Sequence, residues 1–210
     1  MPGPDDPILT AAAAIFREQG YASATFELVA QRARLSVEQV HSRFADKSAL
    51  FAALLETTSP LPDLLIAFDT AQNNRQNAET DGEAAQADAG EMLRDAMRLM
   101  VKAMQAHDEF LELAAIDMQV NNGAFVSGLT TQIVPKALEL LKRLKATGQL
   151  RPVSDVILAR TLVSLFMGFV LSERVMPQVA RMAMRMFGQR AWIDGMVDLL
   201  LYGVLEDDAR

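Results

Sequence analysis

The sequence of 210 residues contains no cysteine and only two histidines. The absence of cysteine excludes disulfides, thiolate catalysis and cysteine-ligated metal sites, and it gives no information on the redox compartment. His41 falls within one expected helix and His107 near a helix junction, so neither a histidine-pair metal site nor a Ser-His-Asp triad is expected. Glycine-rich phosphate loops and nucleotide-binding fingerprints are also missing. The sequence therefore predicts no catalytic residue, no metal site and no cofactor.

Long hydrophobic runs and an export signal are missing as well. The longest apolar run, residues 161–172, is too short to span a bilayer and lies between Arg160 and Glu173, which favours a buried helix. The opening Met-Pro-Gly-Pro-Asp-Asp contains neither a basic region nor an apolar stretch, which argues against secretion. With 50% apolar residues the composition is that of a globular chain. We expect a soluble, cytoplasmic protein without membrane contact.

Helical periodicity is what the sequence does contain, and it is clearest over residues 8–51. Apolar residues at helical spacing predict a first helix, which ends at Gly20 because glycine permits the backbone conformation that terminates helices. Thr25 and Ser36 are typical N-caps for a second and a third short helix, and Asp46 for a fourth. This pattern of short helices predicts a helix-turn-helix.

The third of these helices has a polar outer face. Val40 and Phe44 lie four residues apart and are expected to pack inward. The side chains left on or near the outer face, which a major groove would meet, are Val37, Glu38, Gln39, His41, Ser42 and Arg43. Residues 1–56 are therefore expected to form a DNA-binding domain.

This segment resembles the N-terminal part of the TetR family of transcriptional regulators. The match is continuous and includes the helix before the helix-turn-helix and the lysine after it. It rests on Ile8-Leu9, Ala12, Ile15-Phe16-Arg17-Glu18-Gln19-Gly20-Tyr21, Thr25, Val29-Ala30, Ala33, Leu35-Ser36, Val40, Phe44, Lys47 and Leu50. Residues 199–204 are similar to the family's usual last helix. The resemblance implies an all-α homodimeric repressor that binds a palindromic operator of double-stranded DNA and is released by a small apolar or amphipathic effector.

The contacts expected with DNA fall into two groups. Phosphates are assigned to Thr25, Ser36, Ser42 and Lys47. Base edges or methyl groups are assigned to Val37, Glu38, Gln39 and Arg43. His41 is assigned to either group, because an imidazole can bond to a phosphate or to a base.

The segment departs from the family pattern at several positions. Arg34 occupies a turn position that is usually glycine, and a positive φ there would strain arginine by about 1 kcal/mol. Glu38 brings a carboxylate to the DNA-facing surface, where phosphates repel it unless it accepts from a cytosine amino group. His41 replaces the usual tyrosine, and Asp5 and Asp6 replace the usual basic arm. These changes weaken the expected electrostatic attraction to DNA.

Charge leaves two functions open. Residues 1–56 contain five Lys or Arg and seven Asp or Glu, but residues 31–50 contain four of those basic residues and two acidic ones. Local charge governs contact more than the domain total does, so DNA binding of moderate affinity is expected. The alternative is a helical ligand-binding or scaffold dimer whose helix-turn-helix no longer reads DNA.

Residues 57–210 are expected to form a second helical domain for effector binding and dimerisation. The two prolines within residues 57–62 predict a break after the fourth helix. Residues 72–89 carry no large apolar side chain and predict a mobile loop, with a solvated helical extension as the alternative.

Two helices of this second domain, one around Phe166 and one near the C-terminus, are apolar nearly all round. Such helices are either deeply buried or shared between subunits, and pairing with symmetry mates would form a four-helix interface. The residues expected at this interface are Leu162, Leu165, Phe169, Ile193, Met196 and Leu200.

A methionine stripe allows two interpretations. Thioethers adapt to irregular ligands and could line an effector cavity, but a single apolar stripe is also typical of ordinary core packing. The candidate cavity residues are Met97, Met100, Met104, Phe110, Asp117, Phe125 and Phe166. Asp117 is the polar exception, and it either recognises a cationic or hydrogen-bonding ligand group or is a capped or solvated carboxylate.

Overall fold

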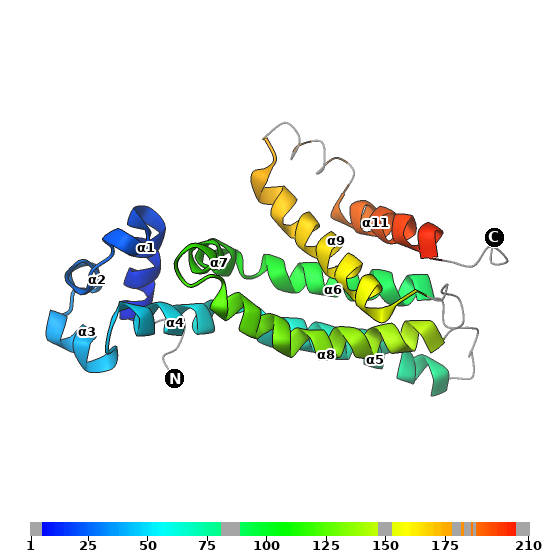
Figure 1. Cartoon of the computed structure of the whole chain (residues 1–210), viewed down its shortest axis with the longest axis horizontal. Coiled ribbons are helices and arrows are strands. Elements are labelled where there is room, and N and C mark those ends of the chain that lie inside the picture. Colours follow the sequence, from blue (N-terminus) through cyan, green and yellow to red (C-terminus); the bar gives the residue numbers. More distant parts are fainter. Residues whose placement is uncertain are drawn as a thin grey trace. The chain divides into compact units, whose positions relative to one another are not determined.

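The computed structural model describes residues 6–80, 89–146, 153–177, 182, 186 and 188–204, and these residues form helices and no strand (Figure 1). The helices are α1 (Pro7–Ser23), α2 (Phe26–Ala33), α3 (Val37–Arg43), α4 (Lys47–Thr58), α5 (Leu61–Thr80), α6 (Ala89–Gln105), α7 (Asp108–Val120), α8 (Ala124–Ala146), α9 (Asp155–Val175) and α11 (Gln189–Val204). The predicted all-α class is confirmed. The chain divides into two compact units, Met1–Pro60 with His107–Thr131 and Leu61–Ala106 with Gln132–Arg210, called here the first and the second unit.

Side-chain caps set the helix starts of the first unit. The Thr25 side chain accepts from the backbone N–H of Leu28 at the start of α2, and the Asp46 side chain accepts from that of Ala49 at the start of α4. At Gly20, φ is 77° and the helical conformation of α1 is interrupted. Each cap satisfies a backbone donor that the helix itself leaves unpaired. The capping pattern predicted from the sequence is therefore confirmed.

An aromatic cluster holds α1 and α4 together in the first unit. The ring of Phe16 lies 5.1 Å from that of Phe51 and 5.6 Å from that of Tyr21, centroid to centroid. Phe16 and Phe51 are fully buried, and such aromatic pairs add about 0.5–1.5 kcal/mol each beyond their area burial. The same unit packs α1 against α2, α2 against α3, and α7 against α1 and α4. The short helix α3 is held in this unit through its packing against α2.

In the second unit, α6 contacts α5, α9 and α11 (Figure 1). The apolar stripe of α6 is buried at Leu93, Met97, Val101 and Met104. These positions recur at three- and four-residue intervals and so lie on one helix face. The methionine stripe thus packs in the core of this unit.

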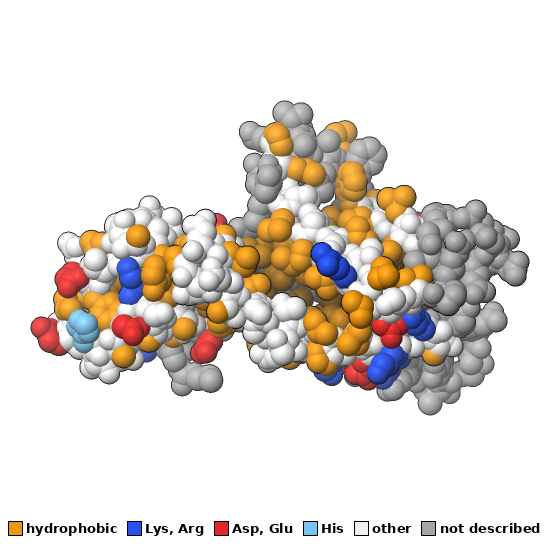
Figure 2. All heavy atoms as spheres, in the orientation of Figure 1, with side chains coloured by type: hydrophobic (Ala, Val, Ile, Leu, Met, Phe, Trp, Pro, Cys, Tyr) orange, Lys and Arg blue, Asp and Glu red, His pale blue; other side chains and the backbone are white. Residues whose placement is uncertain are grey.

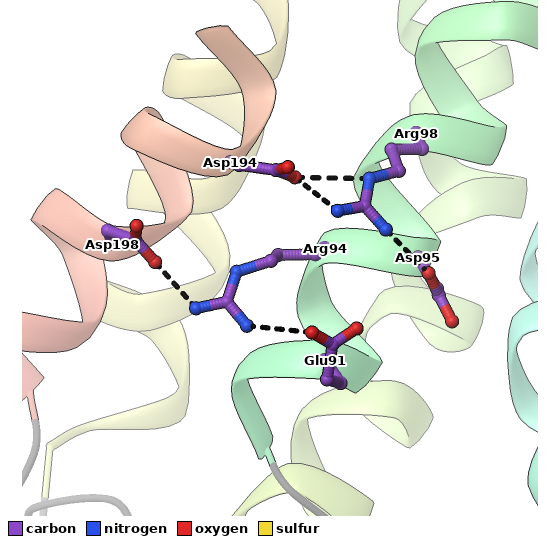
Figure 3. Close-up of polar contacts among 6 residues, drawn as sticks. All are labelled: Glu91, Arg94, Asp95, Arg98, Asp194 and Asp198. Carbon is purple, nitrogen blue, oxygen red and sulfur yellow. Dashed lines mark hydrogen bonds and ion pairs between the residues drawn. The ribbon is translucent and has the colours of Figure 1, made fainter. Parts of the chain in front are cut away.

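Paired charges fix α11 on α6 (Figure 3). Arg94 Nη2 lies 2.6 Å from Asp198 Oδ1, and Arg98 Nη2 lies 2.5 Å from Asp194 Oδ1. Residues four apart lie on one helix face, so the two arginines of α6 meet the two aspartates of α11 in antiparallel order. Glu91 and Asp95 contact the same arginines from within α6. A shift of α11 by one residue would break both bonds, so this ladder fixes the register of the two helices.

Two expected breaks in the helical pattern have different outcomes. The break predicted within residues 57–62 is confirmed, because α4 ends at Thr58 and α5 begins at Leu61. The loop expected over residues 72–89 is helical up to Thr80 as the end of α5, which agrees with the alternative of a helical extension. Residues 81–88 lie outside the described part of the chain.

Candidate functional site

The outward face of α3 is the centre of the candidate site. Ser36 and Gln39 form a capping box, in which Ser36 Oγ accepts from the Gln39 N–H at 3.3 Å and Gln39 Oε1 accepts from the Ser36 N–H at 2.8 Å. Val40 and Phe44 are buried, as predicted, so the opposite face points to solvent. That face consists of the half-buried Val37 and the exposed Glu38, Gln39, His41, Ser42 and Arg43.

The smaller polar side chains of this surface already have local hydrogen-bond partners. Ser42 Oγ donates to the backbone carbonyl of Gln39 at 2.8 Å, and Thr25 Oγ1 accepts from the N–H of Leu28 at 3.4 Å. A hydroxyl has one donor and two acceptor lone pairs, so each group keeps some capacity for a phosphate. The bonds of these two hydroxyls to the backbone fix the direction in which their remaining hydrogen-bonding groups face.

His41 and Glu38 give this surface its character. The His41 ring packs edge-on against Phe26, with ring centroids 4.7 Å apart. Hydrogen bonds from the N–H of Glu38 itself and from Ser36 lower the pKa of the Glu38 carboxyl, which is therefore negatively charged at neutral pH. Acidic side chains are prominent around α1–α3 on the face shown in Figure 2. The outward face of α3 therefore carries a carboxylate beside His41 and Arg43.

Lys47, at the start of α4, makes contacts that its sequence position did not indicate. Its Nζ donates to the carbonyl oxygens of Tyr21 at 2.7 Å, Ala22 at 3.2 Å and Ala24 at 3.1 Å. It also lies 4.6 Å from the centroid of the Tyr21 ring. An ammonium has three N–H donors, and here all three have carbonyl partners. Lys47 thus ties the start of α4 to the last turn of α1 and to Ala24, which follows it.

Arg43, the last residue of α3, pairs with Asp6, the residue that precedes α1. The same Asp6 side chain accepts from the backbone N–H of Ile8 at 2.9 Å and so caps α1. Burial raises the pKa of Asp6, but the hydrogen bonds from Arg43 and Ile8 lower it by more, and the net pKa lies below its ordinary value. Sequence reasoning placed Asp6 in an acidic arm and did not connect it with Arg43.

Arg34 occupies a turn position that is usually glycine, and its backbone has a positive φ. It has φ 57° and ψ 40°, in the left-handed region, and its N–H donates to the carbonyls of Ala30 and Gln31 at the end of α2. The condition under which arginine would be strained at this position is therefore met, in a turn that glycine would occupy without strain.

The residues proposed for an effector cavity fall in both units. Met97, Met104 and Phe166 are buried in the second unit, and Met100 is half-buried there. Phe110 and Phe125 belong to the first unit, where their ring centroids lie 6.3 Å apart. Burial of Met97 and Met104 agrees with the core interpretation of the methionine stripe.

Asp117 is buried, with 1% of its surface exposed. Its Oδ1 accepts from the side-chain amide of Asn121 at 3.1 Å. Its Oδ2 accepts from the backbone N–H groups of Phe125 at 3.1 Å and Val126 at 3.3 Å. These two residues lie in the first turn of α8, where backbone donors have no partner within the helix. Asp117 is therefore a capped carboxylate that closes the turn between α7 and α8.

The residues expected at a subunit interface differ in exposure. Phe169 and Ile193 are buried within the second unit. Leu162, Leu165, Met196 and Leu200 are half-buried. The large apolar side chains that α9 and α11 expose are Val156, Ile157, Val163, Leu171, Trp192 and Leu199. Figure 2 shows hydrophobic side chains at the surface over these two helices.

Metal binding and membrane insertion gain little support from the described residues. Among them, no three His, Asp or Glu side chains are grouped so as to hold a metal ion.

Two stretches, Lys47–Ala71 and Asp155–Ser172, have the length and hydropathy of a membrane span. The first is interrupted between α4 and α5, and core helices of globular proteins satisfy the same criterion as the second. Composition alone therefore assigns neither stretch to a membrane.

Comparison with known sequences identifies the N-terminal segment. Residues 8–54 match the family model described as bacterial regulatory proteins, tetR family. These residues cover α1 to α3 and most of α4, including the whole outward face of α3. No curated protein matches the chain.

Solved structures share the fold over nearly the whole chain. The TetR family transcriptional regulator PfmR from Thermus thermophilus is 20% identical, with a TM-score of 0.65 and coverage of 93% of this chain and 94% of its own. SmeT, the repressor of the Stenotrophomonas maltophilia multidrug efflux pump SmeDEF, is 21% identical, with a TM-score of 0.63 and coverage of 96% and 90%. The superantigen PfiT is 18% identical, with a TM-score of 0.63 and coverage of 98% and 99%. At these identities the likeness shows a common fold.

Proposed function

Because residues 8–54 match the family model of tetR-family bacterial regulatory proteins and the chain shares its fold with TetR-family transcriptional regulators, we propose that it is a TetR-family protein, a cytoplasmic, homodimeric repressor that binds a palindromic DNA operator. The observation that carries this proposal is the capped and exposed helix α3, which packs against α2 through its buried side within the segment that matches the family model. Residues 1–56 would bind DNA, and residues 57–210 would bind the effector and the second subunit.

In this proposal α3 enters the major groove. Val37, Glu38, Gln39 and Arg43 meet base edges, while Thr25, Ser36 and Ser42 meet phosphates, and His41 meets either. The three carbonyl partners of Lys47 support a different role from the phosphate contact expected of it. We propose that Lys47 mainly fixes α4 on the end of α1 and so sets the position of α3.

The proposed dimer rests on the apolar side chains that α9 and α11 expose. Val156 and Ile157 are 73% and 62% exposed, and Leu199 is 77% exposed. Helices of this kind pair readily with a symmetry mate, because each copy covers the apolar surface of the other. Two copies of α3 would then reach successive major grooves about 34 Å apart. A small apolar or amphipathic effector would favour a dimer with a different spacing and release the DNA.

Selection of bound duplexes from a random pool by the purified protein tests this proposal. We expect a palindrome whose half-sites are one helical turn apart. Failure to enrich any sequence, together with weak binding of random duplex at low salt, would favour a helical scaffold dimer that does not read DNA. The internal pairing of most basic side chains in the first unit is the observation in favour of that second candidate.

A further inference from the structure

The first unit contains five Lys or Arg side chains, and four of them are bound within the protein. Their partners are Glu109 and Glu112 for Arg17, Glu18 for Arg32, Asp6 for Arg43 and three backbone carbonyls for Lys47. Arg34 has no hydrogen-bond or ion-pair partner for its side chain among the described residues. Affinity for any DNA depends on basic side chains that neutralise phosphates, so this pairing bears directly on DNA binding.

The pair between Arg43 and Asp6 differs from the others because Arg43 is on the recognition helix. It joins the end of α3 to the residue that precedes α1, across 37 positions of the sequence. The Asp6 side chain is only 7% exposed, whereas that of Arg43 is 40% exposed. Asp6 is further held by the N–H of Ile8, so the carboxylate is fixed and the guanidinium is the partner that can leave.

We propose that Asp6 withholds Arg43 from the phosphates of non-specific DNA, and that Asp6 thereby lowers the affinity of the DNA-binding surface for duplex of random sequence. This inference rests on the proposed function. A guanidinium pairs with a carboxylate and with a phosphate through the same fork of N–H donors, so the two acceptors compete for Arg43. DNA binds Arg43 only by displacing an acceptor that the fold already positions.

The competition with Asp6 limits what Arg43 adds to the binding of random duplex. Random duplex offers Arg43 a phosphate, which replaces one charged acceptor with another and gains little. An operator can offer the bidentate edge of guanine, but there too the pair with Asp6 must first be broken. Holding Arg43 back therefore lowers the affinity for random duplex.

The test is salt-dependent binding of a random-sequence duplex to Asp6→Asn. Asparagine is as good an N-cap as aspartate, so α1 keeps its start while the acceptor loses its charge. The matched control is Asp46→Asn, because Asp46 is also an N-cap, accepts from the Ala49 N–H at 2.8 Å and forms no ion pair among the described residues. Both variants change the net charge by the same amount. The difference in DNA affinity between them therefore reports the release of Arg43.

We expect the plot of log affinity against log salt to be steeper by about 0.9 for Asp6→Asn than for Asp46→Asn, which corresponds to one additional phosphate contact. At about 0.1 M salt that contact makes Asp6→Asn bind roughly eightfold more tightly than the control. Adding Arg43→Ala to Asp6→Asn should remove this gain, while Arg43→Ala alone should change the slope little.

The outcomes that overturn the inference are distinct. Equal slopes for Asp6→Asn and Asp46→Asn would show that Arg43 is not withheld. A steeper slope that persists in the double variant with Arg43→Ala would show that the new contact is made by another group. Absence of DNA binding by every variant at low salt would instead refute the proposed function, and this inference with it.

Discussion

Removal of the Asp117 carboxylate should destabilise the fold, and the size of the effect depends on what replaces it. Oδ2 of Asp117 accepts from two backbone N–H groups of α8, and the side chain is buried. Alanine leaves both donors without a partner in a site where water has little access. An unsatisfied buried group costs about 1–3 kcal/mol, so Asp117→Ala should lower the free energy of unfolding by about 2–4 kcal/mol.

Asp117→Asn is the matched variant. Its amide oxygen can accept from Phe125 and Val126, and its NH₂ can donate to Asn121 Oδ1 once the Asn121 amide turns over, so only the negative charge at the start of α8 is lost. That loss is worth about 1 kcal/mol or less. If the Asp117 carboxylate instead recognised a cationic effector, both substitutions would weaken effector binding equally.

Urea unfolding followed by far-ultraviolet circular dichroism measures these differences. In thermal unfolding of a protein of 210 residues, a loss of about 3 kcal/mol in the free energy of unfolding lowers the Tm by roughly 6–12 °C. Gln119→Ala, at an exposed position of the same helix α7, controls for general effects of alanine. An Asp117→Ala variant within about 0.5 kcal/mol of the wild type would refute the capping role.

Four further predictions concern stability and assembly. Arg34→Gly should stabilise the fold by about 0.5–1 kcal/mol in urea unfolding because φ there is positive, and the absence of a gain would argue against strain at this turn. Lys47→Met should cost about 2 kcal/mol by the same measurement because three carbonyls lose a charged donor, whereas unchanged stability with weaker DNA binding would indicate a phosphate contact. Val163→Glu on α9 should sediment as a monomer while Val134→Glu on α8 stays dimeric, and equal behaviour would exclude the α9 surface from the interface. Because the pKa of Asp6 is lowered in the folded state, its carboxylate stabilises the fold at neutral pH, and this contribution is lost as the pH falls below about 4. Asp6→Asn should therefore lose less unfolding free energy than the wild type over that pH range. Equal losses for the two proteins would contradict a stabilising role of the Asp6 carboxylate.

The helix-turn-helix was predictable from the sequence because its signals are local. Thr25, Ser36 and Asp46 cap helices through bonds that reach three residues along the chain. The left-handed conformation of Arg34 was anticipated from the glycine usually found in similar sequences. Such features depend on residues a few positions apart, so a pattern in the sequence specifies them directly.

The contacts of Lys47, Arg43 and Asp117 were not predictable in the same way. Lys47 binds carbonyls 23 to 26 positions earlier, and any residue can supply a carbonyl, so no side-chain pattern marks these partners. Asp117 was recognised as an exception in an apolar stretch, but its donors are backbone groups of the next helix. Long-range packing decides such pairs.

Helix α9 shows a further limit of sequence patterns. A helix that is apolar nearly all round has no clear stripe, so its sequence does not indicate which face is buried. Phe169 was therefore expected at a subunit interface although it is buried within the second unit, and the exposed Val163 and Leu171 were not singled out. In contrast, the four-residue spacings of Arg94 and Arg98 and of Asp194 and Asp198 were visible signals of the ladder between α6 and α11.

Base reading by α3 can be tested by operator selection with Glu38→Gln alongside the wild type. Glu38 is exposed near the start of α3 and negatively charged, so it can accept from the amino group of cytosine, whereas glutamine pairs with adenine. We expect the selected palindrome to change from cytosine to adenine at one symmetric pair of positions and nowhere else. An identical palindrome for both proteins, or a uniform loss of binding without a change in base preference, would contradict the account.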